Sequence, residues 1–178
     1  PNVTNSNEWV KLSTPGYCFL KNGGTVTKTN GAYYNWYTVN TGKLAPKGWH
    51  VPTTNEWTTL EDYLISNGYN FDGSVFEDKI AKSLASQTGW FSSTNSGTIG
   101  YNQSANNKSG FRGLPSGRCC GEYGSFYDVG VYCFLWSASD NLFEPGRAWF
   151  RSLNYDEKTF DSYYTTKTSG FSVRCVRD

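Results

Sequence analysis

His50 is the chain's only histidine, so it is the first side chain to consider for catalysis or metal binding. A histidine that acts as a general base needs a nucleophile beside it and a carboxylate that orients its ring. No second histidine is present to build a His-rich zinc site. We therefore interpret His50 as a structural residue, which pins the loop before a helix that begins near Thr53.

Five cysteines are the other candidates for chemistry, namely Cys18, Cys119, Cys120, Cys133 and Cys175. They contain no Cys-x-x-Cys pair, and one histidine cannot complete a Cys/His zinc site. We expect disulfides formed in an oxidising compartment, with one thiol left over. Adjacent cysteines rarely pair because the ring is strained, so the simplest local disulfide joins Cys133 to one of the vicinal pair. Free thiols are the alternative.

Acidic residues in the expected loops raise the question of calcium: Asp128, Asp140, Glu144, Asp156 and Asp161. Calcium requires several oxygen atoms that converge on one point, and no Glu-Pro-Asn or Trp-Asn-Asp motif supplies them. The run Glu144-Pro145-Gly146 is better explained by a tight turn. The sequence therefore predicts no metal and no cofactor.

The bulk composition limits the function classes. A length of 178 residues suits one domain with its own core. A formal net charge of +1, with scattered Lys and Arg, argues against nucleic acid as a partner. No apolar run is long enough to span a membrane. The aromatic content of 17% favours recognition, because Tyr and Trp give large contact areas at a low cost in rotamer entropy.

The pattern of elements predicts an α+β fold with two early helices, a small antiparallel sheet and long loops. Each helix is expected to begin with a capping box, at residues 53–56 and 74–77. Apolar residues then follow at helical spacing, Trp57, Leu60 and Leu64 in the first helix and Phe76, Ile80 and Leu84 in the second. Strands are expected over residues 17–20, 33–39, 132–137, 148–155 and 170–177, with a turn at 21–24. Residues 89–130 are too long for one structureless loop, so they must contain short strands.

Several ordered segments resemble one family, the Fibrobacter succinogenes major paralogous domain. They are YYNWYTVN at 33–40, GWHVPT at 48–53 with Glu56 and Trp57, SGFRGLP at 109–115, LWSAS at 135–139, AWFRSLNY at 148–155 and GFSVRCVRD at 170–178. The resemblance covers residues 17–178 and implies an exported bacterial domain with a C-type-lectin-like fold. In that fold the first and last strands lie side by side, which would bring Cys18 near Cys175. The family often has a cysteine where this chain has Ala45, which puts the pairing of Cys175 in doubt.

The family is similar in turn to two functional groups. One is the set of variable proteins that retroelements diversify, in which rewritten codons alter a displayed binding face. The other is the formylglycine-generating enzyme group, which uses a pair of thiols with copper. The surroundings of Cys119, Cys120 and Cys133 do not resemble the active-site motifs of that group.

Residues 148–155 alternate, and this pattern locates the expected binding face. The motif residues Trp149, Arg151, Leu153 and Tyr155 share one side of the strand, which we expect to be core. The other side would then point outward. Aromatic side chains beside Asp and Asn are typical of antibody-like binding surfaces. The predicted ligand-binding residues are Tyr127, Tyr132, Phe134, Asp140, Asn141, Phe143, Phe150, Ser152, Asn154, Asp156, Tyr163 and Tyr164.

We therefore expect residues 1–16 to form a loose lead-in, and residues 17–178 to form a single C-type-lectin-like domain. We expect a bacterial ligand-binding module, secreted or at the cell surface, that is not an enzyme. Its partner would be a protein or a glycan, and it would be displayed by a larger surface protein or an anchored lipoprotein. Diversification by a retroelement is our preferred hypothesis. The alternatives are an oxidoreductase like the formylglycine-generating enzyme and a structural module of a pilus or surface layer.

Overall fold

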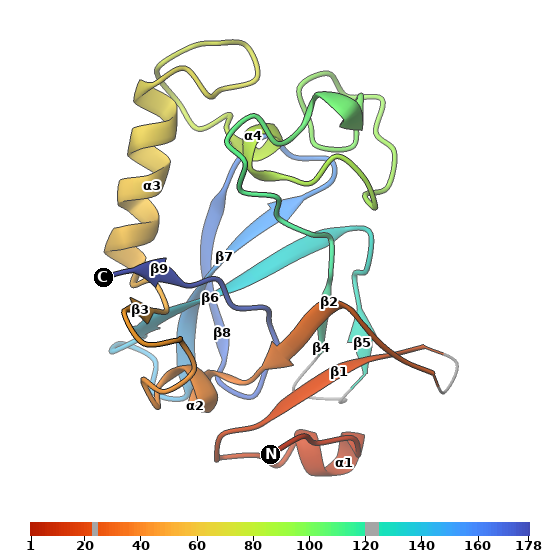
Figure 1. The fold of residues 1–178 in the computed structure, drawn as a ribbon, viewed down its shortest axis with the longest axis vertical. Helices are drawn as coiled ribbons and strands as arrows, with labels where there is room; N and C mark the ends of the chain where they lie inside the picture. Colours follow the sequence, from red (N-terminus) through yellow and green to blue (C-terminus); the bar gives the residue numbers. More distant parts are fainter. Residues whose placement is uncertain (23–24, 120–124) are drawn as a thin grey trace.

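The computed structural model describes residues 1–22, 25–119 and 125–178, and it is a mixed α+β fold with small antiparallel sheets (Figure 1). The expected α+β class is thus confirmed. Cys120 and the glycines of the expected turn, at 23 and 24, lie outside the described residues. The helices are α1 Ser6–Trp9, α2 Trp36–Val39, α3 Thr54–Ser66 and α4 Ala81–Leu84, with a 3-10 turn at Gln103–Ala105. The strands are β1 Tyr17–Asn22, β2 Thr25–Tyr34, β3 Trp49–His50, β4 Arg118–Cys119, β5 Phe126–Tyr127, β6 Tyr132–Asp140, β7 Arg147–Asn154, β8 Asp161–Thr166 and β9 Val176–Arg177.

The three-stranded antiparallel sheet β6-β7-β8 is the centre of the fold (Figure 1). Phe134 lies opposite Ser152, and Phe150 lies opposite Tyr163. The register shifts between Trp136 and Asp140, so β6 carries an irregularity just before its turn into β7. Strand β8 is an edge strand, and the sequence pattern did not predict it.

Both faces of this sheet are covered. On one face Leu135 and Leu153 pack in a core cluster with residues of α3 and α4. On the other face Phe134 and Phe150 pack against Phe171 at ring-centroid distances of 4.8 and 4.9 Å. The expectation that Phe150 and Ser152 point outward is therefore wrong, because they are only 8% and 3% exposed. Alternation identified residues that share a face, but a sheet buried on both sides has no outward face at these positions.

Helix α3 begins at the capping box that the sequence predicts. The Thr53 amide donates to Glu56 Oε2 at 2.8 Å, and the Glu56 amide donates to Thr53 Oγ1 at 3.3 Å. Trp57 and Leu64 are buried, as the helical spacing requires. The donated hydrogen bonds from Thr53, with His50 beside them, lower the pKa of Glu56.

The second expected helix is mostly absent. Only α4 is helical, and Glu77 adopts a positive φ of 58°, which no α-helix contains. The Asn70 side chain makes the hydrogen bonds that a helix would otherwise satisfy. Its amide donates to the carbonyls of Phe76 and Glu77, and its oxygen accepts from the Lys79 amide. Phe76 is consequently exposed rather than buried.

The predicted strand at 33–39 is also divided in two. Strand β2 ends at Tyr34, and the Asn35 side chain accepts from the Thr38 amide at 3.1 Å to cap α2. Strand β1 begins at Tyr17 as expected, but it continues to Asn22, two residues into the expected turn. The short strands β4 and β5 fall within residues 89–130, where short strands were expected. Of residues 170–177, only β9 is a named strand, and it pairs with β3.

The first residues are not a loose lead-in. Helix α1 presents Trp9, which is buried with Cys18, Tyr33 and Cys119 in a third core cluster. The Trp9 indole donates to the Thr168 carbonyl at 2.9 Å, so α1 is attached to a segment far away in the sequence. Val3 is buried as well.

Residues 170–172 join the separate parts of the fold. Gly170 and Cys119 exchange backbone hydrogen bonds of 2.7 and 2.9 Å, and Phe171 does the same with Tyr34 at 2.8 and 3.1 Å. The Trp136 amide donates to the Ser172 carbonyl at 3.1 Å. This segment therefore contacts β4, β2 and β6 in three consecutive residues.

Candidate functional site

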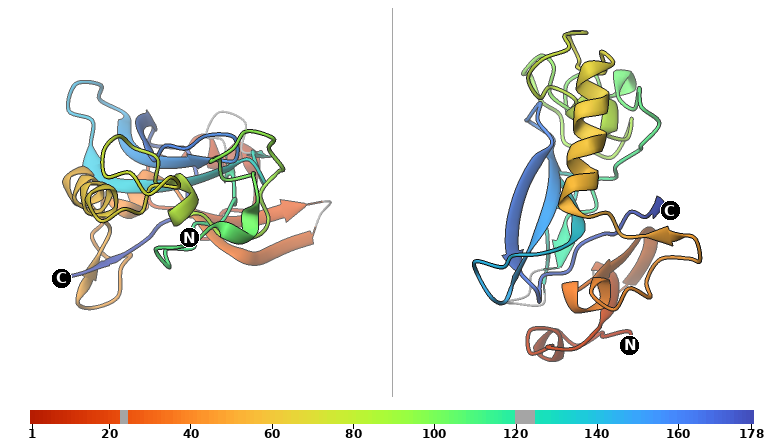
Figure 2. Two further views of the ribbon diagram at one scale, coloured as in Figure 1. Left: turned by 90° about the horizontal axis from the view of Figure 1, so that it is seen from above. Right: turned by 90° about the vertical axis from the view of Figure 1, so that its left-hand side faces the viewer.

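The turn between β6 and β7 carries two apolar side chains in solvent. Leu142 is 85% exposed and Phe143 is 94% exposed. Figure 2 shows this turn, in cyan to light blue, projecting beyond the rest of the molecule in both views. Large apolar groups at a projecting tip are not needed for the fold, because they contact little of it.

Hydrogen bonds hold the turn in one conformation. Asn141 is buried, its side-chain oxygen accepts from the Phe143 amide at 3.1 Å, and its own amide donates to the Arg147 carbonyl at 3.2 Å. Lys167 forms an ion pair of 2.7 Å with Asp140, and its ammonium lies 4.5 Å from the centre of the Trp36 ring. The base of the turn is thus tied by an ion pair to Lys167, the residue after β8, which also contacts the Trp36 ring of α2.

Aromatic and charged side chains continue the apolar tip onto the sheet. Trp149 and Tyr164 meet edge to face at 5.3 Å, and the Arg147 guanidinium lies 5.6 Å from the Tyr164 ring centre. A hydrogen bond with Glu144 raises the pKa of the Tyr164 phenol. We call this set the hairpin surface: Leu142, Phe143, Glu144, Arg147, Trp149 and Tyr164.

The structure brings only some of the predicted ligand-binding residues together here. Phe143 and Tyr164 belong to the hairpin surface, while Asp140 and the buried Asn141 support it from below. On the opposite face, neighbouring rings form a row across the sheet with centroid distances of 4.8, 5.7 and 6.1 Å, namely Tyr132, Phe134, Phe150 and Tyr163. Of that row only Tyr163 is largely exposed.

The remaining predicted residues lie elsewhere. Tyr127 is exposed on β5, and Asn154 pairs with Tyr132 at the far end of the sheet. Asp156 accepts hydrogen bonds from Ser93 and Asn95, so it braces a loop. Ser152 is buried opposite Phe134.

The sequence prediction did not name four members of the hairpin surface, and it assigned one of them, Trp149, to the core. The four are Leu142, Glu144, Arg147 and Trp149. A signal was present, because an apolar Leu-Phe pair stands between Asn141 and the Glu-Pro-Gly turn. A turn normally carries polar residues, so two apolar ones at its tip are a departure that the sequence alone shows.

His50 has the structural role that the sequence predicts. Its Nε2 lies 2.6 Å from Glu56 Oε1 and its Nδ1 lies 2.6 Å from Asp178 Oδ1. Both carboxylates raise the pKa of His50, and the hydrogen bond with Asp178 contributes most. The ring thus joins β3, the start of α3 and the residue after β9.

The cysteines are arranged differently from what was expected. The described cysteines, 18, 119, 133 and 175, are all free thiols. Cys18 faces Cys119 rather than Cys175, because β9 pairs with β3 and not with β1. Cys133 packs with Leu153 in another core cluster, so its expected disulfide with Cys119 is wrong. Cys120 lies outside the described residues.

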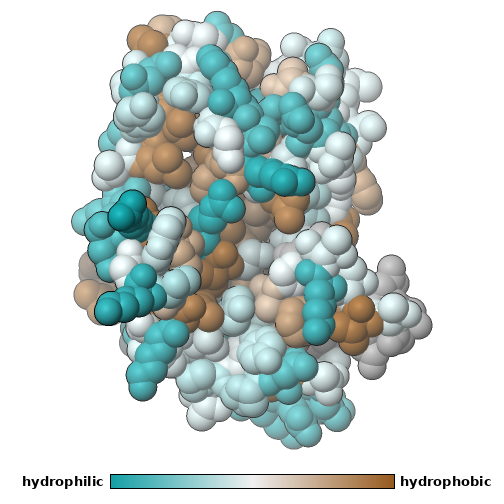
Figure 3. Space-filling model, viewed as in Figure 1, coloured by the Kyte–Doolittle hydropathy of each residue, from teal (hydrophilic) through white to brown (hydrophobic). Residues whose placement is uncertain are grey.

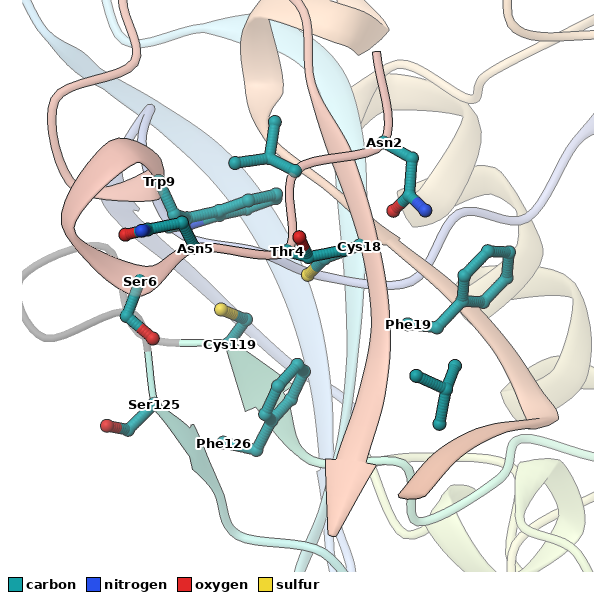
Figure 4. Close-up of a pocket in the computed structure, with 12 residues that line it drawn as sticks. Asn2, Thr4, Asn5, Ser6, Trp9, Cys18, Phe19, Cys119, Ser125 and Phe126 are labelled. Atoms are coloured by element: carbon teal, nitrogen blue, oxygen red, sulfur yellow. The ribbon is translucent and has the colours of Figure 1, made fainter. Parts of the chain in front are cut away.

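Two of the hollows in the structure lie beside these cysteines. A pocket of about 450 Å³ lies between α1, β1 and β5, beside Cys18 and Cys119 (Figure 4). A second hollow of about 250 Å³ is lined by Leu114, Leu135 and Val173 with Arg112 and Arg174. Figure 3 shows apolar residues gathered in a depression in the middle of the face that is viewed in Figure 1. Neither hollow includes a residue of the hairpin surface.

Among residues 1–22, 25–119 and 125–178, no helix is long and apolar enough to cross a bilayer. The same residues contain no group of three or more His, Cys, Asp or Glu side chains arranged to hold a metal ion.

Comparison with known proteins gives one result. The model of the Fibrobacter succinogenes major domain matches residues 2–177, which includes the α1 segment as well as the later motifs. No curated protein and no solved structure matches the chain. The match extends over nearly all of the sequence, and the motifs at 48–53 and 148–155 fall on β3 and β7 within it. The chain therefore belongs to the Fibrobacter succinogenes major domain family.

Proposed function

We propose that this chain is a ligand-binding module, exported or displayed at the bacterial surface, and that the hairpin surface holds a protein ligand. One observation carries the proposal: Leu142 and Phe143 are 85% and 94% exposed on a turn that is braced from both sides. Apolar side chains on a rigid support supply binding free energy without first losing conformational entropy. The ion pairs around them match the polar rim of a protein interface.

The shape of the tip favours a protein over a glycan. A projecting apolar pair fits into a cavity on a partner, as anchor residues of protein interfaces do. Small-molecule sites are instead concave, with polar groups that converge on the ligand. Both described hollows lie away from the hairpin surface.

The scaffold we propose is C-type-lectin-like, and the resemblance to variable proteins supports diversification by a retroelement. Tyr163, Tyr164 and Phe143 are exposed and have residue types that replacement of adenines in an AAC-type codon can reach. The buried Phe150 and Ser152 are poorer candidates for variation, because core positions tolerate few changes. The DNA beside the gene tests this idea. A near-copy with adenine mismatches at the codons of the hairpin surface supports diversification, and mismatches confined to buried codons contradict it.

We also propose that the buried thiols Cys18 and Cys133 take no part in catalysis. Burial raises the pKa of Cys133 to about 12. The hydrogen bond with Cys119, together with burial, also raises the pKa of Cys18. A thiolate is the reactive form, so both groups are poor nucleophiles near neutral pH. Rapid alkylation of Cys18 or Cys133 in the folded protein at pH 7 would favour the oxidoreductase alternative.

Ligand selection tests the hairpin surface. Peptides selected from a phage-displayed cyclic library against the wild-type protein are measured against a Leu142→Ser/Phe143→Ser variant. We expect most peptides to lose at least about tenfold in Kd, which is the effect of removing about 1.4 kcal/mol of binding free energy. The melting temperature should be unchanged, because neither side chain packs in the core.

Phe76→Ser is the matched control. Phe76 is also exposed, and it lies on the loop between α3 and α4. Peptides that lose affinity equally for both variants would indicate general hydrophobic adsorption and contradict the proposal. Self-assembly of the wild type that the double variant lacks, without peptide capture, would favour the pilus or surface-layer alternative.

A further inference from the structure

Cys18 on β1 and Cys119 on β4 meet in the third core cluster, although they are far apart in the sequence. Figure 4 shows the two sulfur atoms projecting from different strands into the same space, below Trp9 and Thr4. Both residues are buried, and both line the same pocket. A disulfide requires two cysteine side chains that project into the same space from nearby backbone.

Among the residues that the structure describes, the neighbours of this pair offer no metal site, and the Tyr33 hydroxyl has a partner other than sulfur. Tyr33 and Trp9 are the large neighbours in the cluster, and neither is one of the usual zinc ligands. The Tyr33 hydroxyl donates to the Ser116 carbonyl, so it is not a partner for sulfur. The described residues contain no third metal-ligating side chain beside the two cysteines.

A route to the pair exists. The pocket of about 450 Å³ is lined by both cysteines, and Asn2, Asn5 and Ser6 give its wall a polar character. A small disulfide or a flexible peptide loop that carries one can therefore approach the thiols. Thiol–disulfide exchange requires such access, because the attacking sulfur must reach the sulfur of the oxidant.

We propose that Cys18 and Cys119 are a cross-linking site, and that they form a disulfide between β1 and β4 when the protein meets a disulfide oxidant. The Cys119 thiol loses its proton and attacks the oxidant, which breaks the oxidant's S–S bond and forms a mixed disulfide. The Cys18 thiol then loses its proton to solvent, attacks the Cys119 sulfur and displaces the oxidant's remaining sulfur. The two cysteines are oxidised by two electrons in total, and the oxidant leaves as two thiols.

The other described cysteines lie in other parts of the fold and do not face Cys18 or Cys119. Cys133 packs among Leu135 and Leu153 in the first core cluster. Cys175 directly precedes β9, which pairs with β3 and not with β1. The cross-link therefore joins the N-terminal strand pair to the segment that Gly170 holds by backbone hydrogen bonds.

The bond would close a loop of about 100 residues, for which the loss of denatured-state entropy is large. We expect the melting temperature to rise by about 10 °C on oxidation. This inference is independent of the hairpin surface, because neither cysteine contacts it.

The test uses the full chain equilibrated in a glutathione redox buffer, quenched with an alkylating reagent and digested without reduction. We expect a peptide containing Cys18 to be linked to the peptide that begins after Arg118. That tryptic peptide runs to Arg147 and holds Cys119, Cys120 and Cys133, so fragmentation of the backbone between these cysteines assigns the partner. A link to Cys120, Cys133 or Cys175, or no link in oxidised buffer, would overturn the proposal.

Two variants give a second readout. Cys120→Ser should keep both the cross-link and the gain in melting temperature on oxidation. Cys119→Ser should lose both, while its melting temperature in reducing buffer stays close to that of the reduced wild type. A Cys119→Ser protein that still gains stability on oxidation would show that another pair is responsible.

Discussion

Lys82 and His50 are each held by hydrogen bonds from several directions at once. The Lys82 ammonium is buried and donates to the carbonyls of Thr98 and Asn102 and to Asn106 Oδ1 at 3.3, 3.1 and 2.7 Å. It also donates to the Tyr101 carbonyl. All four acceptors lie on one loop, so a single cation organises residues 98–106. Burial lowers the pKa of this lysine, since no carboxylate is among its acceptors.

Replacement of Lys82 by Met should therefore be costly. The apolar chain would remain, but buried oxygens would lose their donor, and we expect a loss of about 3 kcal/mol in the free energy of unfolding. Lys108→Met is the control, because the exposed Lys108 donates to a single acceptor, the Gly68 carbonyl. It should cost less than about 1 kcal/mol. Urea denaturation of both variants measures the difference, and equal losses would contradict the role given to Lys82.

His50 is the only histidine, so its titration can be followed without assignment problems. We expect its pKa to lie above the ordinary value of 6.5, and to fall in Asp178→Asn more than in Glu56→Gln. Because the folded-state pKa is raised, the stabilisation is fully present below the unfolded pKa and is lost as the pH rises through the folded one. Proton NMR of the imidazole measures the pKa. A value at or below 6.5 in the wild type would show that the two carboxylates do not act on the ring.

Among the elements, those fixed by nearby residues were predicted best. The capping box at 53–56 is complete within four residues, and α3 begins where it predicts. The second capping box failed because Asn70, outside the predicted helix, satisfies the backbone of Phe76 and Glu77. Strand β8 was missed because an edge strand with exposed Tyr163 and Tyr164 lacks a buried alternation.

Strands β4 and β5 depend on a glycine that the sequence pattern does not mark. Gly117 has a φ of +66°, and a Cβ at this position would lie 2.2 Å from the Tyr127 carbonyl oxygen. We expect Gly117→Ala to reduce the free energy of unfolding by about 3 kcal/mol or more.

The Gly110→Ala variant separates the effect of backbone strain from the effect of the close contact with Tyr127. Gly110 has a φ of +77° but no atom within 4 Å of the added carbon, so only backbone strain remains. A loss of about 1 kcal/mol is expected there. Denaturant titrations compare the two variants, and similar losses would mean that the close approach to Tyr127 is relieved by a shift of β5.

At the scale of the whole molecule, the sequence predicted which residues share a face but not which face meets solvent. Residues 148–155 alternate as expected, yet Phe150 is covered by Phe171, which lies about twenty residues further along the chain. Burial at this distance depends on the path of the chain, which local spacing does not contain. Phe143, by contrast, lies on a local turn, and this predicted binding residue is exposed in the structure.

Trp9 shows the same dependence on long-range packing. Its ring is 2% exposed, and its indole donates to the Thr168 carbonyl. We expect Trp9→Ala to cost about 3–5 kcal/mol, the range for removal of a buried Trp side chain. Trp49→Ala is a suitable control, because Trp49 is 45% exposed. Guanidinium denaturation checks both, and a small effect of Trp9→Ala would mean that residues 1–16 are dispensable for the fold.

The segment of residues 170–172 contacts β2, β4 and β6, and its Phe171 ring covers the central sheet. These contacts have a consequence for synthesis. While a ribosome is still making the protein, Phe171 is absent and the aromatic row on the sheet has nothing to cover it. The domain therefore completes its core only after nearly the whole sequence has left the ribosomal tunnel. Until then the growing polypeptide cannot complete the cover of its central sheet.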